Sequence, residues 1–141
     1  MINISIQMID RSVNSDWWKN IVSHLLCPGD KLEIRCWREE TEEIKRASLY
    51  GETCIDNYEV SIKGRVTEEF LAELQSEEPA DKSLYNKMTN YFTINVENER
   101  CGFSSAHYGT EMYLERLSEA DASFVKNEIG KYPESFSISV Y

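Results

Sequence analysis

Apolar and polar residues alternate with a period of two in several parts of the chain, which is the pattern of half-buried β-strands. It appears in four stretches: Ile2–Met8, Leu32–Cys36, Tyr58–Ile62 and Phe136–Val140. Aromatic and β-branched residues, which favour strands, add Tyr91–Val96, and Thr110–Leu114 is a further candidate. The pattern therefore predicts a sheet assembled from segments that are spread over the whole sequence.

Helical spacing of apolar residues alternates with these strands. Ser15, Thr67 and Ser118 each stand where a helix N-cap is expected, ahead of such a stripe. The three stripes begin at Trp17, Phe70 and Phe124, and Ser118 also opens a capping box with Asp121. We further expect a short helix around residues 84–88. Residues 38–47 suit a helix closed by a left-handed Gly51, with a strand over residues 44–50 as the alternative.

The order of these elements predicts one α+β domain over residues 1–141. Its length is that of a single domain, and it holds no repeat or Gly/Pro/Ser-rich linker. Strands that do not alternate regularly with helices favour a mainly antiparallel sheet with about three to four helices packed against it. We expect core positions for the three tryptophans, Trp17, Trp18 and Trp37.

The charge balance narrows the class of partner. Fifteen basic and twenty-five acidic residues give a net charge of −10. Nucleic-acid binding depends on Lys and Arg displacing counterions, and anionic membranes also attract basic segments, so we expect neither partner. No apolar run is long enough to span a bilayer, and no export signal is visible at Met1. We therefore expect a cytoplasmic protein whose four cysteines stay reduced.

Carboxylates are concentrated between Thr67 and Asp81, where no basic residue occurs. A surface field of one sign attracts a ligand of the opposite sign and raises association rates by about 10–10³-fold. The alternative is a helix face that is simply solvated. The candidate partner-binding residues of this segment are Glu68, Glu69, Glu73, Glu77, Glu78 and Asp81.

A second acidic cluster follows Trp37. Four glutamates lie between residues 39 and 43, and Arg38, Lys45 and Arg46 flank them, so that local pairing can weaken their field. Aromatic residues beside charged ones are common at interfaces. The candidate partner-binding residues here are Trp37, Glu39 and Glu40.

The best catalytic candidate is the segment from Cys101 to Glu111. His107 has the side chain best suited to act as a base near neutral pH, with Cys101, Ser104 or Ser105 as nucleophile. Glu111 is placed to orient the histidine, and a Cys/His/Glu metal site is also conceivable. Loose groupings of this kind are mostly structural, and no established catalytic or phosphate-binding motif occurs. We therefore expect no catalytic residue, no metal and no cofactor.

The chain resembles immunity proteins of bacterial contact-dependent growth inhibition and related polymorphic toxin systems. The resemblance is one of character: a lone small domain, the acidic segment Glu68–Asp81, the Glu39–Glu43 cluster and no catalytic signature. It implies an antidote that binds a cognate toxin with a basic surface, such as a nuclease, and no functional residue can be transferred. Two alternatives stay open: a small hydrolase-like enzyme that uses His107 with Cys101 or Ser105, and an accessory or regulatory protein-binding module. The oligomeric state is also open.

Overall fold

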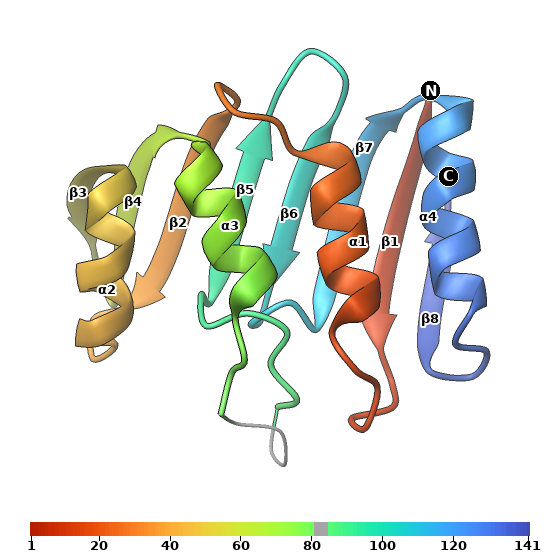
Figure 1. The fold of residues 1–141 in the computed structure, drawn as a ribbon, viewed down its shortest axis with the longest axis horizontal. Coiled ribbons are helices and arrows are strands. Elements are labelled where there is room, and N and C mark those ends of the chain that lie inside the picture. The colour runs from red at the N-terminus through yellow and green to blue at the C-terminus, as the bar shows by residue number, and fades with distance from the viewer. Residues whose placement is uncertain (81–84) are drawn as a thin grey trace.

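The computed structural model describes residues 1–80 and 85–141. In these residues the chain forms one eight-stranded sheet in which every pair of neighbours is antiparallel, in the order β3-β4-β2-β5-β6-β7-β1-β8 (Figure 1). The α+β prediction with a mainly antiparallel sheet is confirmed.

The elements have the following bounds. The strands are β1 (Ile2–Met8), β2 (Lys31–Trp37), β3 (Gly51–Asp56), β4 (Glu59–Arg65), β5 (Thr93–Glu97), β6 (Gly102–Ala106), β7 (Glu111–Leu117) and β8 (Phe136–Val140). The helices are α1 (Asp16–Leu25), α2 (Thr41–Ala47), the 3-10 turn η1 (Ser48–Tyr50), α3 (Glu68–Ser76) and α4 (Glu119–Gly130).

All the strands predicted by alternation are present, and two more were not predicted. The unpredicted strands are β3 and β6. No helix forms in the described residues 85–92, while Leu84 lies outside the described part. Of the two alternatives for this part of the chain, the helix is the one that forms: α2 covers Thr41–Ala47, and η1 follows it directly.

Two of the three predicted helix caps are confirmed. The Thr67 hydroxyl accepts a hydrogen bond from the backbone N–H of Phe70 at 3.0 Å, and that of Ser118 accepts one from Asp121 at 3.1 Å. Ser15 makes no such bond with its side chain. Instead, the backbone N–H of Asp16 donates a hydrogen bond to Asn14 Oδ1 at 2.9 Å. The residue before Ser15 therefore provides the acceptor for a free N–H at the start of this helix.

The sequence predicted that Gly51 ends a helix in a left-handed conformation, and this prediction is wrong. The φ of 179° at Gly51 is extended, and this residue pairs with Gly64 at the start of β3. A Cβ at Gly51 would lie 2.2 Å from the Lys63 carbonyl oxygen, and one at Gly64 would lie 1.9 Å from that of Tyr50. The two glycines are therefore required by a close approach of two backbones.

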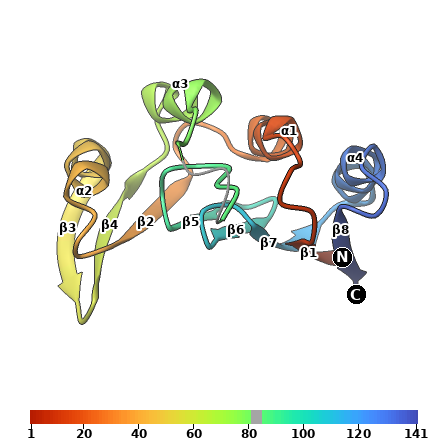
Figure 2. The same ribbon diagram turned by 90° about the horizontal axis from the view of Figure 1, so that it is seen from below.

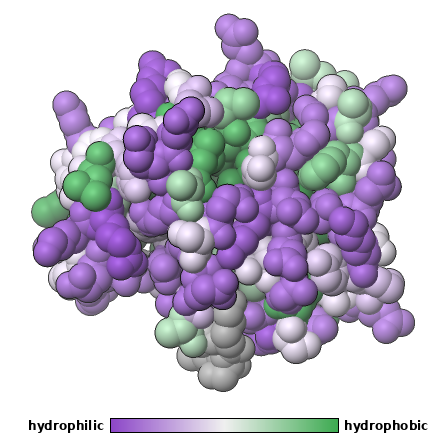
Figure 3. All heavy atoms as spheres, viewed as in Figure 1, coloured by the Kyte–Doolittle hydropathy of each residue, from purple (hydrophilic) through white to green (hydrophobic). Residues whose placement is uncertain are grey.

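The described helices lie together on one side of the sheet, and none of them covers the other side (Figure 2). The core fills the space between them, with Trp17 and Trp18 fully buried as predicted. Trp37 is only half-buried, so its predicted core position is wrong: β2 directs it to the side of the sheet that has no helices. The helix side is largely hydrophilic, with apolar atoms showing between neighbouring helices (Figure 3). None of the described helices is long and apolar enough to cross a bilayer.

Candidate functional site

The acidic segment Glu68–Asp81 does not form one surface. Glu73 lies in the second half of α3, and Glu77 is the extended C-cap residue just past its end. Glu73 accepts hydrogen bonds from the hydroxyls of Tyr50 and Tyr91, at 2.7 and 2.5 Å. Glu77 is 6% exposed, and its carboxylate accepts bonds from the Thr89 hydroxyl and the Asn90 backbone N–H. Glu77 was predicted to meet a partner; it is instead an internal tie between α3 and the segment before β5.

The other described acids of this segment are exposed, but at different places along the chain. Glu68 and Glu69 are exposed in the first turn of α3, and Glu78 is exposed beyond its other end. A nine-residue helix separates the two groups by about 13 Å, since each residue rises about 1.5 Å. Asp81 lies outside the described residues. Of the described acids of this set, Glu68, Glu69 and Glu78 are the ones exposed for steering a partner.

The Cys101/His107 group is not assembled. Cys101 precedes β6 and His107 follows it, so a full strand separates them by about 20 Å at roughly 3.3 Å per residue. Cys101 is fully buried, and burial raises the pKa of its thiol. Ser105 is also buried and accepts a hydrogen bond from Trp18 Nε1 at 3.1 Å. Ser104 donates to Asn95 at 2.7 Å. Neither serine is placed to be activated by His107.

His107 contacts Glu111 through Nδ1, as the sequence suggested. The Glu111 carboxylate also accepts a hydrogen bond from the Tyr113 hydroxyl at 2.6 Å. Among the described residues, no group of three His, Cys, Asp or Glu side chains could hold a metal ion. The His107–Glu111 pair is thus an exposed link across a hairpin, without a nucleophile or metal ligand set beside it.

The hairpin between β6 and β7 has an unusual backbone. His107, Tyr108 and Gly109 have φ values of 49°, 60° and 84°, so three consecutive residues are left-handed. For a bulky residue such as Tyr108 this conformation is strained and costs about 1–3 kcal/mol. It persists because Tyr108 is held on both sides: its N–H donates to the Phe92 carbonyl at 3.0 Å, and its carbonyl accepts from Met88 at 2.8 Å. The strained turn fixes the direction of the Tyr108 side chain.

Around Tyr108 lies an aromatic cluster that the sequence did not predict. Phe92 packs at its centre, with ring centroids 4.7 Å from Trp37, 5.5 Å from His107 and 5.3 Å from Tyr108. Tyr85 is 48% exposed and lies 5.9 Å from Tyr108. Lys87 Nζ sits 4.0 Å from the centroid of the Tyr108 ring. We define the aromatic cluster as Trp37, Tyr85, Phe92, His107 and Tyr108.

Part of the second acidic cluster borders these rings. Glu40 accepts a hydrogen bond from the Tyr108 hydroxyl at 3.0 Å and another from the Trp37 backbone N–H at 2.8 Å. Burial and the charge of Glu40 raise the pKa of Tyr108, so that the phenol stays a donor. Glu39 is exposed beside them, while Glu42 and Glu43 belong to the first turn of α2. Two predicted partner-binding residues, Trp37 and Glu40, are therefore gathered around Tyr108, and Glu39 is exposed next to Glu40 in the chain.

The cluster sits at one end of the sheet, which we call the loop end; it consists of residues 37–41, 57–58, 85–92 and 107–110. The β3–β4 turn joins it, because the backbone N–H of Arg38 donates to the Tyr58 carbonyl at 3.0 Å. Tyr58 is 77% exposed. The loop end thus presents partly exposed aromatic rings, which are enriched where proteins bind one another, with polar and charged residues around them.

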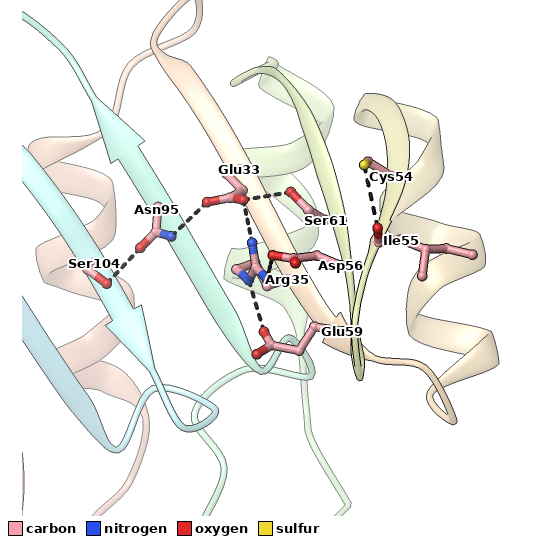
Figure 4. A network of polar contacts seen from close by, with 9 residues as sticks. All are labelled: Glu33, Arg35, Cys54, Ile55, Asp56, Glu59, Ser61, Asn95 and Ser104. Atoms are coloured by element: carbon pink, nitrogen blue, oxygen red, sulfur yellow. Dashed lines mark hydrogen bonds and ion pairs between the residues drawn. The ribbon is translucent and has the colours of Figure 1, made fainter.

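The uncovered side of the sheet carries a polar network centred on Arg35 (Figure 4). Its guanidinium donates to Glu33, Glu59 and Asp56 at 2.9, 2.9 and 2.7 Å. Partial burial acts to raise the pKa of Glu33, but hydrogen bonds from Ser61, Asn95 and Arg35 together lower it. One guanidinium stands against three carboxylates, so the group keeps two excess negative charges. Its hydrogen bonds hold Arg35 in place between the strands.

The comparisons with known proteins give no further assignment. No family model, no curated protein and no solved structure matches this chain. The arrangement of its own residues therefore carries the functional argument. The sequence did not identify three members of the aromatic cluster as site residues: Tyr85, Phe92 and Tyr108. Two signals of an organised loop were present, namely adjacent aromatic residues at positions 91 and 92 and a Tyr-Gly pair at 108 and 109.

Proposed function

We propose that this protein is an inhibitor of the immunity type, which acts in the cytoplasm by binding a cognate toxin domain through its loop end. The observation that carries the proposal is the gathering of the aromatic cluster with Glu39 and Glu40 at one end of the sheet. Interface energy is concentrated in a few aromatic or arginine anchors inside a polar rim. The loop end offers such anchors already ordered by the rest of the fold.

Preorganisation supports the binding role. The strained hairpin at Tyr108 is anchored to residues 88–92 by backbone hydrogen bonds. A surface that is ordered before binding loses little side-chain and loop entropy when the partner arrives. Catalysis would require a nucleophile or metal near His107, and Cys101, Ser104 and Ser105 are all engaged elsewhere.

Electrostatics support a basic partner. Net charge of −10 gives the whole molecule an attractive field for a cation-rich surface, and Glu39 lies exposed at the loop end. A toxin that acts on nucleic acid needs a basic groove for its polyanionic substrate. The loop end itself carries no net charge, since Arg38 and Lys87 balance Glu39 and Glu40, so the field of the whole chain would draw it to that groove and its rings would exclude the substrate. Charge would set mainly the association rate, and the rings would set the dissociation rate.

The proposal is tested with the toxin domain encoded by a gene adjacent to this one. Co-expression should protect cells from that domain, and the two purified proteins should bind. Replacing Tyr85 with Ala should weaken binding by about 30-fold, which corresponds to 2 kcal/mol. The matched control is Tyr141→Ala, another exposed tyrosine, located beyond β8. Tyr85 is exposed enough for its removal to leave the fold intact.

Charge is tested by a second pair of variants. Glu39→Gln combined with Glu40→Gln should slow association and flatten its dependence on salt, whereas Glu99→Gln with Glu119→Gln, at the other end of the sheet, should not. Failure to protect cells, or equal effects of the two pairs, contradicts the proposal. A regulatory module with an unrelated partner would use the same surface but would give no protection against a toxin.

A further inference from the structure

Strand β8 leaves a row of backbone groups directed away from the sheet. It lies at one edge, where its ladder within the described residues is with β1 (Figure 1). Asn3 and Tyr141 exchange backbone hydrogen bonds at 2.8 and 2.9 Å, and Ile9 donates to Ser135 at 2.8 Å. Along an antiparallel strand, the backbone N–H and C=O groups of successive residues point alternately to one side and the other. Between these pairs, the residues that direct these groups toward β1 are therefore 137 and 139. Phe136, Ile138 and Val140 therefore direct their N–H and C=O groups outward.

This edge lacks the features that usually prevent pairing. Edge strands are commonly protected by charges, prolines or bulges. The opposite edge, β3, carries Glu52 and Asp56, whereas β8 has the uncharged sequence Phe-Ser-Ile-Ser-Val. Ile138 is 39% and Val140 48% exposed. The two edge strands of the sheet thus differ in charge, and the uncharged strand β8 is the one open to pairing with a further strand.

An apolar groove runs beside the open edge. It lies between β8 and α4, has a volume of about 390 Å³, and is lined by the side chains of Ile129, Tyr132, Pro133, Phe136, Ile138 and Val140. Helix α4 packs mainly on α1, β1 and β7, and so leaves the helix-side face of β8 incompletely covered. Apolar side chains from an added strand would enter this groove on the same side as Ile138.

We infer that this edge is a self-association surface, where β8 of a second copy pairs antiparallel about a two-fold axis at Ile138. The strand is self-complementary: Phe136 comes opposite Val140 of the other copy, and Ser137 comes opposite Ser139. Outward-directed N–H and C=O groups then meet their equivalents in hydrogen-bonded pairs. A two-fold contact of this kind is closed, so it gives a dimer and not a fibre.

Charge is compatible with a second copy at this site. Two molecules with a net charge of −10 repel one another over most of their surface, yet β8 itself brings no carboxylate to the contact. The charged residues that line the groove, Lys126 and Glu134, have opposite signs. Pairing of the two β8 strands therefore places no like-charged side chains of these strands opposite each other.

The experiment measures the mass of the full chain by sedimentation equilibrium over about a hundredfold range of concentration. The expected result is a rise from monomer toward dimer. Ile138→Lys places like charges opposite each other across the two-fold axis and should raise the dimer dissociation constant by about tenfold or more. The matched control is Ile55→Lys on the opposite edge strand, where Ile55 is 63% exposed; its dimer should be unchanged.

Amide hydrogen exchange on the unmodified protein gives a second readout that does not depend on a variant folding. The amides of Ile138 and Val140 should exchange more slowly as concentration rises, while those of Ser137 and Ser139, which are bonded to β1, should be protected throughout. A monomer at every concentration, exchange at Ile138 that ignores concentration, or a dimer that survives Ile138→Lys but not Ile55→Lys would each overturn the inference.

Discussion

The buried carboxyl of Glu77 makes the stability of this protein depend on pH. Its two hydrogen bonds, from the Thr89 hydroxyl at 2.8 Å and the Asn90 N–H at 2.7 Å, favour the ionised form. Burial acts in the opposite direction and is the larger effect, with the charge of Glu73 adding to it. The result is a pKa raised from 4.5 to about 7 in the folded protein. Glu77→Gln removes the titration and keeps the shape and an acceptor oxygen.

The size and sign of the effect follow from that difference. A tenfold change in an ionisation constant corresponds to about 1.4 kcal/mol, so the ionised form of Glu77 costs the folded state about 3 kcal/mol. Between pH 4.5 and about 7 the unfolded chain loses this proton while the folded protein keeps it. The folded state then binds more protons than the unfolded state. The free energy of unfolding must therefore fall as pH rises through this window.

The assay is denaturant unfolding followed by tryptophan fluorescence, for the unmodified protein and Glu77→Gln at a series of pH values from 4.5 to about 8. The stability of the unmodified protein relative to the variant should fall by about 3 kcal/mol across the series. Glu78→Gln is the matched control, because the side chain of Glu78 is 83% exposed. The difference in free energy of unfolding between this variant and the unmodified protein should stay the same across the window. A constant difference for Glu77→Gln would refute the reasoning.

Two further substitutions test local features of the fold. Thr67→Ala removes the cap of α3 and should lower the free energy of unfolding by about 1 kcal/mol, measured by the same denaturant assay, with Thr41→Ala as a control because the start of α2 has no side-chain cap. Gly109→Ala should cost several-fold more, about 3 kcal/mol or above, because a Cβ there would lie 2.7 Å from Met88 Cβ and 2.8 Å from Trp18 Nε1, and φ is +84°; a melting temperature close to that of the unmodified protein would contradict the structure of this turn.

Elements with a local signature could be predicted, because the forces that form them act within a few residues. Alternation in β1 and β2 reflects a sheet with one face covered, and the capping hydroxyls of Thr67 and Ser118 bond donors three residues away. Strand β3 has no such pattern: it is an edge strand, exposed at nearly every position. Strand β6 is short and rich in Gly and Ser, and it forms because β5 and β7 enclose it.

The candidate site could be predicted only in part, because density of charge along the sequence is not density of charge in space. Glu73 and Glu77 are drawn inward near the end of α3 and just past it, whereas Glu68 and Glu69 are exposed in its first turn. Conversely, Glu40 and Tyr108 are far apart in sequence and meet at 3.0 Å. Trp37 and Phe92 are brought together by the pairing of β2 with β5. Contacts of this kind depend on strand order, which no local pattern encodes.

Strand order also separates the two surfaces proposed for this protein. The loop end draws its rings from the ends of β2, β5 and β6, and β7 and β1 lie between these strands and β8. In the two-fold dimer the paired β8 strands run in opposite directions, so the sheets of the two copies do as well. Their loop ends then lie at opposite ends of the joined sheet. Each copy could therefore hold its own toxin domain, and loss of the dimer through Ile138→Lys would leave the loop end of each monomer unaltered.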